Sequence, residues 1–272
     1  PAMTQTGRGS PTGVRTRPQV DPRISARRAA EARRVGRRRL RRILVALGVV
    51  VVLVLAVVLL RSPLFSARVV TVEGPHPHTS TAAIVRAAGV VSRPPLISVD
   101  PSVAAADVER LPWVGKATVA RSWPDGVVIT VTERRAVATM SAPGGRAALV
   151  DATGRTLEVV ASRPSGLPAL VIHQGGSVLA PAAVGGFLPT PAGAALDVAA
   201  TLPPAFAAQV IQVVGMAGGT VDLDLNSGLT VLLGNATDLS TKYHDVASII
   251  AAAPLKGAHT IDVTVPSAPV VS

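Results

Sequence analysis

The 272-residue chain contains no cysteine and very few aromatic residues, which make up 2% of it. The lack of cysteine excludes disulfide frameworks, zinc–thiolate sites and thiol nucleophiles. The lack of aromatics means that any core must be built mainly from aliphatic and small side chains. Both absences favour a modest aliphatic scaffold over a thiol-based catalyst.

Catalytic signatures are also missing from the sequence. No G-x-S-x-G or S-x-x-K motif is present, and neither is a dinucleotide-binding or phosphate-binding glycine loop. A glycosidase needs two convergent carboxylates, but the acidic residues are expected at caps, turns and exposed strand faces: Asp100, Asp125, Asp151, Asp222, Asp224 and Asp238. We therefore predict a protein that is not an enzyme, with no catalytic residues and no cofactor.

The most ligand-like motif is His76-Pro77-His78. Two histidines at this spacing can face one ion, but a structural zinc site needs four ligands, and no third ligand stands near them in the sequence. We predict a solvated loop and no metal site.

Charge is concentrated at the start of the chain. Residues 1–42 hold 13 Arg against Asp21 and Glu31, so this segment alone carries the net charge of +11. Its composition, poor in large apolar groups, predicts a disordered tail over 1–42. The Arg-dense end of the tail could become helical near a surface.

A long apolar run, residues 43–60, follows the tail and is bracketed by Arg42 and Arg61. Eighteen helical residues span about 27 Å, close to the bilayer core. We predict a transmembrane helix over 43–61; a cleaved signal peptide is the alternative, although Phe65-Ser66-Ala67 is a poor cleavage site. The Arg imbalance predicts a cytoplasmic N-terminus and extracytoplasmic C-terminal domains in the plasma membrane.

Arginines that abut such a span are expected to contact anionic lipid headgroups, rather than nucleic acid. The residues predicted for this role are Arg37, Arg38, Arg39, Arg41 and Arg42.

Beyond the span, residues 69–133 show the pattern of a βααββ unit. Asp100-Pro101 predicts the start of its second helix, and alternation across Trp123-Pro124-Asp125-Gly126 predicts a hairpin. The hairpin region carries both tryptophans of the chain: Trp113 is expected to close the helix onto the sheet, and Trp123 to anchor the turn.

The region from Ala136 onward is rich in predicted strands. Residues 147–151 and 156–160 form one pair, and 220–225 and 229–233 form another. Asp238 can cap a late helix, and 260–265 is the last strand. The overall expectation is an α+β protein.

These segments together resemble the FtsQ/DivIB family of bacterial cell-division proteins. The resemblance is carried by the order and spacing of motifs over residues 37–268: VVTVEG at 69–74, LPWV at 111–114, RSWP at 121–124, TER at 132–134, LVDATG at 149–154, and the later pieces LP at 167–168, LG at 233–234, Lys242 and IDV at 261–263. The Arg-rich tail and the scarcity of lysine resemble the actinobacterial branch.

The resemblance implies a POTRA domain over 66–135, a β domain over 136–268 and a short tail over 269–272. It also implies a membrane-anchored scaffold at the division septum that binds FtsB/DivIC-like and FtsL-like proteins. Through them it would help to recruit or regulate septal peptidoglycan synthesis with other divisome proteins.

In the family, the last strand of the β domain accepts a strand from the partner. Carried over by position, the predicted partner-binding residues are Thr260, Ile261, Asp262, Val263, Thr264, Val265, Pro266, Ser267 and Ala268. From the residues alone, alternation of polar and apolar side chains and the stop at Pro266 agree with an edge strand.

Two other functions stay open at this point. A POTRA domain also occurs in translocation or secretion components, and an anchored envelope enzyme is a more distant alternative. The first predicts location in an outer membrane, and the second predicts turnover that one acidic substitution would abolish.

Overall fold

The computed structural model describes residues 22–252, 257–265 and 269–272, with side chains from Arg39 onward except Pro191. The chain divides into two compact units, Pro1–Leu59 and Leu60–Ser272. Each unit is described separately below.

The first unit consists of the long helix α1 (Pro22–Leu60). Residues 22–42 are helical in this structure, whereas a helix was expected only at the Arg-dense end of the tail; residues 1–21 lie outside the described part of the chain. Arginine and alanine are good helix formers, and an adjoining apolar helix removes the cost of starting a new one. Within α1, Arg39–Leu60 is a candidate membrane span of 22 residues.

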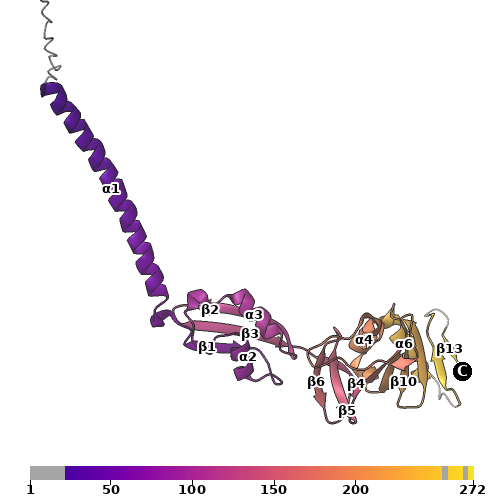
Figure 1. Ribbon diagram of the computed structural model, residues 1–272. Helices are drawn as coiled ribbons and strands as arrows, with labels where there is room; N and C mark the ends of the chain where they lie inside the picture. Colours follow the sequence, from indigo (N-terminus) through magenta and orange to yellow (C-terminus); the bar gives the residue numbers. More distant parts are fainter. Residues whose placement is uncertain (1–21, 253–256, 266–268) are drawn as a thin grey trace, which may run out of the picture. The chain divides into compact units, whose positions relative to one another are not determined.

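The second unit begins with a POTRA-type βααββ arrangement, as predicted (Figure 1). Its elements are β1 (Val69–Glu73), α2 (Thr81–Ala87), α3 (Pro101–Glu109), β2 (Val114–Ser122) and β3 (Gly126–Glu133). The sheet order is β1-β3-β2, with β1 parallel and β2 antiparallel to the central β3. Short 3-10 turns cover Pro63–Phe65 and Leu96–Ser98.

Alternation along β3 places Val127, Ile129 and Val131 in the domain core, as predicted. Asp100 caps α3 by accepting hydrogen bonds from the amides of Ser102, at 2.9 Å, and Val103, at 3.2 Å. These local signals suffice to place β3 and α3.

The two tryptophans differ from their predicted roles. Trp123 is half exposed, at 50%, and its ring lies beside the Phe65 ring at a centroid distance of 6.0 Å. Trp113 is buried, but in a cluster with Leu149 and Leu157 of the following domain. Trp113 therefore packs against the following domain, and its role is not confined to its own domain as predicted.

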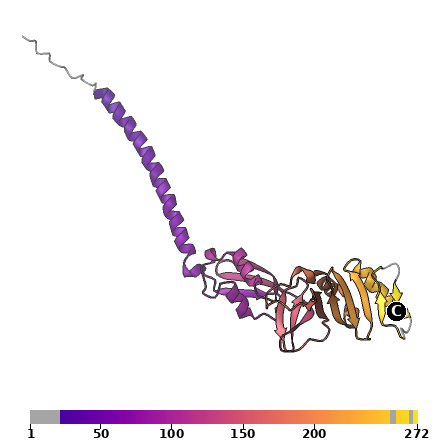
Figure 2. The ribbon, with the colours of Figure 1, turned by 45° about the vertical axis from the view of Figure 1, so that its right-hand side comes forward.

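The β domain combines one large sheet with helices (Figure 2). Its strands are β4 (Ala136–Ala142), β5 (Arg146–Asp151), β6 (Thr156–Val160), β7 (Ala169–Gln174), β8 (Ser177–Val178), β9 (Val210–Gly215), β10 (Thr220–Leu225), β11 (Thr230–Asn235), β12 (Thr260–Asp262) and β13 (Val270–Val271). Its helices are α4 (Gly193–Thr201), α5 (Pro204–Ala207) and α6 (Leu239–Ala252), with a 3-10 turn at Thr190–Ala192.

The sheet order is β13-β12-β11-β10-β9-β7-β4-β5-β6, with β8 paired to β7. The hairpin β10–β11 was predicted, but the central strands β7 and β9 were not. They are held by parallel pairs, β4 with β7 and β7 with β9, between segments far apart in the sequence. The apolar side chains of β10, β11 and α6 share one core, which includes Leu223, Leu233 and Val246.

Candidate partner-binding edge

The last strand predicted from the sequence, 260–265, is shorter in the structure. β12 ends at Asp262, because the Asp262 carboxylate accepts hydrogen bonds from the amide and hydroxyl of Thr264, at 2.9 and 2.7 Å, and bends the chain. The Thr264 hydrogen bonds also hold the pKa of the Asp262 carboxyl below its usual range. Thr264 and Val265 therefore lie beyond the strand, and residues 266–268 lie outside the described residues.

β12 pairs in parallel with β11 on one side, with Thr260 opposite Thr230 and Asp262 opposite Leu232. The backbone amide and carbonyl of Thr260 point to the other side, toward the end of the sheet. Ile261 and Val263 are fully buried in the core. The two valines proposed as binding residues thus differ, because Val263 is a core residue and Val265 is 56% exposed.

The face of the sheet beside this edge carries carboxylates. Burial is the main cause that raises the pKa of Asp222, followed by the nearby charges of Asp224 and Asp262. Asp224 also accepts a hydrogen bond of 3.0 Å from the Thr230 hydroxyl. This face is therefore half buried and acidic rather than the exposed strand face predicted.

Lys242, one of the residues that carried the family resemblance, fastens α6 to the end of β11. The residue is 1% exposed, and its ammonium group donates to the carbonyls of Leu233 and Asn235, both at 2.8 Å, and to the Asn235 side chain at 3.0 Å. Burial lowers the pKa of Lys242. Because β11 pairs with β12, this contact helps to hold the strand against which the candidate edge strand β12 lies.

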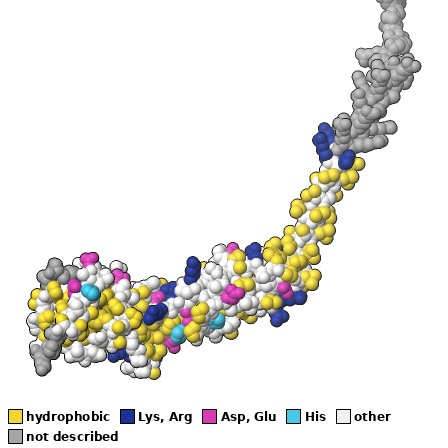
Figure 3. All heavy atoms as spheres, turned by 180° about the vertical axis from the view of Figure 1, so that it is seen from behind, with side chains coloured by type: hydrophobic (Ala, Val, Ile, Leu, Met, Phe, Trp, Pro, Cys, Tyr) yellow, Lys and Arg dark blue, Asp and Glu magenta, His cyan; other side chains and the backbone are white. Residues whose placement is uncertain are grey.

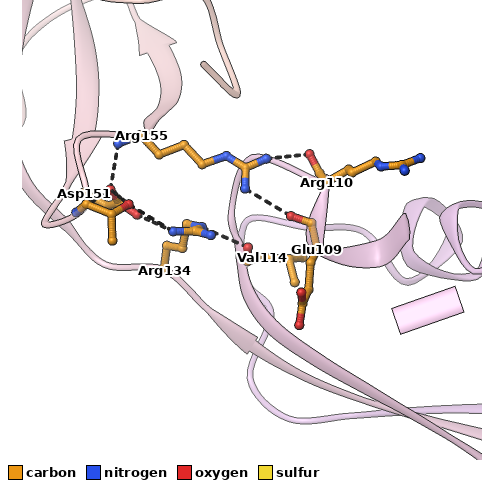
Figure 4. A network of polar contacts seen from close by, with 7 residues as sticks. Glu109, Arg110, Val114, Arg134, Asp151 and Arg155 are labelled. Atoms are coloured by element: carbon orange, nitrogen blue, oxygen red, sulfur yellow. Dashed lines mark hydrogen bonds and ion pairs between the residues drawn. The ribbon is translucent and has the colours of Figure 1, made fainter. Parts of the chain in front are cut away.

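The junction between the POTRA and β domains is a second polar cluster (Figure 4). Arg134 donates to the Val114 carbonyl at 2.9 Å and forms an ion pair of 2.8 Å with Asp151. Arg155 donates to the carbonyls of Glu109, at 3.1 Å, and Arg110, at 2.7 Å. These two carbonyls lie at the C-terminal end of α3, where a helix leaves carbonyl groups without hydrogen-bond partners inside the helix. Arg155 therefore supplies hydrogen bonds that the helix itself does not provide.

Residue patterns alone did not predict this junction, although Arg134 and Asp151 both lie in segments that carried the family resemblance. Asp151 was predicted in an exposed turn, but it is 3% exposed. Burial tends to raise the pKa of Asp151, yet hydrogen bonds from Arg134, Thr153 and the Arg155 amide outweigh it and hold that pKa below its ordinary value.

Acid is therefore expected to weaken the junction. A carboxyl group whose pKa is lowered by folding contributes stability that is present above its unfolded pKa, about 3.9, and is lost as the pH falls through the folded value. Urea unfolding between about pH 5 and pH 2 should show this loss in the parent protein. An Asp151→Asn variant should lack the part of this acid-induced loss of stability that comes from Asp151. An equal pH dependence of the unfolding free energy in the variant and the parent would contradict the stabilising role given to the Asp151 carboxylate.

The two histidines of the His76-Pro77-His78 motif have different partners. His76 contacts the Gly74 carbonyl at 2.7 Å, whereas His78 contacts Glu133 at 2.9 Å and stacks on Trp113 with ring centroids 3.9 Å apart. No group of three metal-ligating side chains occurs in the described ranges. The motif packs a loop against β3 and Trp113, and Pro77 and His78 stay exposed in it.

The arginines predicted to contact lipid lie on α1, where Arg37 and Arg38 are placed by backbone only. Arg39, Arg41 and Arg42 are exposed. Figure 3 shows apolar side chains along the visible face of α1 and basic side chains at the end that adjoins the grey residues. Any covering of this apolar surface must come from outside the described residues, as expected for a membrane span.

The described residues combine one candidate membrane span with an α+β folded part, which consists of a POTRA-type domain and a strand-rich β domain. The POTRA domain model of FtsQ type matches residues 65–134, and the model of the FtsQ/DivIB C-terminal domain matches residues 138–264. The chain belongs to the FtsQ/DivIB family of cell-division proteins.

Individual relatives agree with this assignment. The cell division protein FtsQ of Streptomyces collinus is 32% identical over 242 residues, which cover 88% of this chain and 90% of the relative. FtsQ of Streptomyces griseus is 32% identical over 188 residues, or 65% of this chain and 83% of the relative. FtsQ of Streptomyces venezuelae is 32% identical over 193 residues, which cover 67% of this chain and 66% of the relative.

Proposed function

We propose that this protein is a non-enzymatic, membrane-anchored scaffold of the division machinery that binds an FtsB/DivIC-like protein, together with its FtsL-like partner, by strand addition at β12. Its role would be to recruit or regulate septal peptidoglycan synthesis. The observation that carries the proposal is the outer side of β12, where the Thr260 backbone groups point away from β11 and take a further strand, β13. Main-chain pairing at such an edge provides affinity, and side chains provide selectivity.

The proposal includes a topology. The Arg-rich end of α1 would stay in the cytoplasm, with Arg37, Arg38, Arg39, Arg41 and Arg42 near anionic headgroups, and residues after the span would be extracytoplasmic. The excess of arginine before the span and the balanced charge after it support this orientation. Localisation at the septum is part of the same proposal, and a fluorescent fusion that labels the whole membrane evenly would count against it.

The binding experiment uses a pair of variants at Thr260, whose amide faces outward and whose side chain makes no hydrogen bond among the described residues. Thr260→Pro removes the amide, and we expect it to weaken binding of the FtsB/DivIC-like partner by about tenfold, the equivalent of one main-chain hydrogen bond of about 1.4 kcal/mol. Thr260→Ala keeps the amide and should bind as the parent does. The measurement is a titration of the partner onto the full-length protein in lipid nanodiscs.

Equal binding by the proline and alanine variants would place the partner elsewhere. Val263, chosen from the sequence as a test position, is unsuitable because a charged side chain there would enter the core. Circular dichroism of both Thr260 variants checks that the fold is retained.

A further inference from the structure

The outer side of β12 is covered in this structure by the chain itself. The C-terminal strand β13 runs antiparallel to β12, with Val271 opposite Ile261 and Val270 opposite Asp262. β13 is consequently the end strand of the large sheet, beside the C mark in Figure 1. The segment predicted as a plain tail, 269–272, contains this strand.

Besides the β12–β13 pairing itself, three backbone hydrogen bonds of Ser272 tie this segment to the edge. The Ser272 carbonyl accepts from the amides of His259 and Thr260, at 2.8 and 2.9 Å, and the Ser272 amide donates to the Thr260 carbonyl at 3.0 Å. These are the same outward-facing groups that an added strand would need. One backbone amide cannot serve two strands at full strength, so β13 and an incoming strand exclude each other at this position.

β13 is held weakly by side chains. Val270 is 58% exposed and Val271 is 41% exposed, whereas Ile261 on the strand beneath is fully buried. The short pairing buries little apolar surface, and exposed main-chain hydrogen bonds contribute only modest net stability. The covering strand can therefore leave the edge without unfolding the core.

We propose that β13 is a built-in competitor for the β12 edge, which a partner strand must displace before it can bind. This inference rests on strand addition at β12, the function proposed above. A binding-competent state that is only partly populated lowers the apparent affinity by its populated fraction. The C-terminal segment would thus set the concentration of partner that is needed for the partner to bind this protein.

The first test removes residues 269–272 from the full-length protein in nanodiscs. With the extracytoplasmic domain of the FtsB/DivIC-like protein as the probe, we expect the apparent dissociation constant to fall by about tenfold. Hydrogen exchange without any partner gives a second readout, because the His259 and Thr260 amides should exchange faster after the deletion.

The second test locks the strand in place. The chain has no cysteine, so Thr260→Cys with Ser272→Cys introduces one pair across the edge, at residues that exchange two backbone hydrogen bonds. The oxidised form should lose most partner binding, and reduction should restore it. Each single-cysteine variant should respond to neither treatment.

The outcomes separate the two proposals. If the oxidised, reduced and shortened proteins bind equally while Thr260→Pro still weakens binding, the competitor role is overturned and strand addition survives. If even the shortened protein binds no partner, strand addition itself fails and the competitor role fails with it. Equal amide exchange in the intact and shortened proteins would also overturn the proposal.

Discussion

Replacing Arg134 with methionine is expected to lower the free energy of unfolding by about 3 kcal/mol, because breaking a buried ion pair leaves the other charge without a partner. Asp151, the partner left behind, has a side chain that is 5% exposed. The Val114 carbonyl would lose its hydrogen bond as well. Urea unfolding of the full-length protein in detergent, followed by tryptophan fluorescence, measures the loss, since Trp113 lies at the same junction.

Arg110→Met is the matched control. The Arg110 side chain is 80% exposed and pairs only with Asp107, one helical turn away. Such pairs contribute about 0.5 kcal/mol or less. A double-mutant cycle with Asp151→Asn completes the test: a coupling energy near zero between positions 134 and 151 would show that the ion pair does not stabilise the junction.

The second large effect is expected at Lys242. A Lys242→Met variant keeps the length of the side chain but removes every hydrogen bond to Leu233 and Asn235, leaving buried acceptors unpaired. A hydrogen bond from a charged group stabilises the fold by about 1–3 kcal/mol, and a buried acceptor left unpaired destabilises it by a similar amount. We therefore expect a loss of about 3 kcal/mol in unfolding free energy. Circular dichroism during urea unfolding measures it.

Partner binding should weaken in the same variant, because the end of β11 supports β12 through parallel pairing. Lys116→Met, on the exposed side of β2, serves as the control and should change neither quantity. A stable Lys242→Met protein would mean that packing of Tyr243 and Val246 alone holds α6 in place.

Local patterns predicted the elements with strong periodicity. The alternation of Val127, Ile129 and Val131 placed β3, and the repeat of Tyr243 and Val246 placed α6, because side chains at these spacings fall on one buried face. The apolar run before Arg61 indicated the candidate span from composition alone. In each case the evidence lies within one contiguous segment.

The candidate partner-binding edge is built from more than one segment. The register of β12 on β11 and of β13 on β12 depends on which strands meet, and neighbouring strands in a sheet need not be neighbours in sequence. The family resemblance pointed to 260–268 but included Val263, which the structure places in the core. It gave no indication that residues 270–272 would cover the same edge.

What the sequence determined by itself was the order of parts: a basic segment, an apolar span, a βααββ unit and a strand-rich domain. Hydrophobic periodicity and charge are local properties, and a linear chain displays them directly. Only the tertiary structure decided that Arg155 binds the carbonyls at the end of α3, that Trp113 joins two domains and that the C-terminal strand occupies the β12 edge. The first two contacts join residues distant in sequence, and the third joins two very short strands that carry little pattern of their own, so all three depend on the packing of the whole fold.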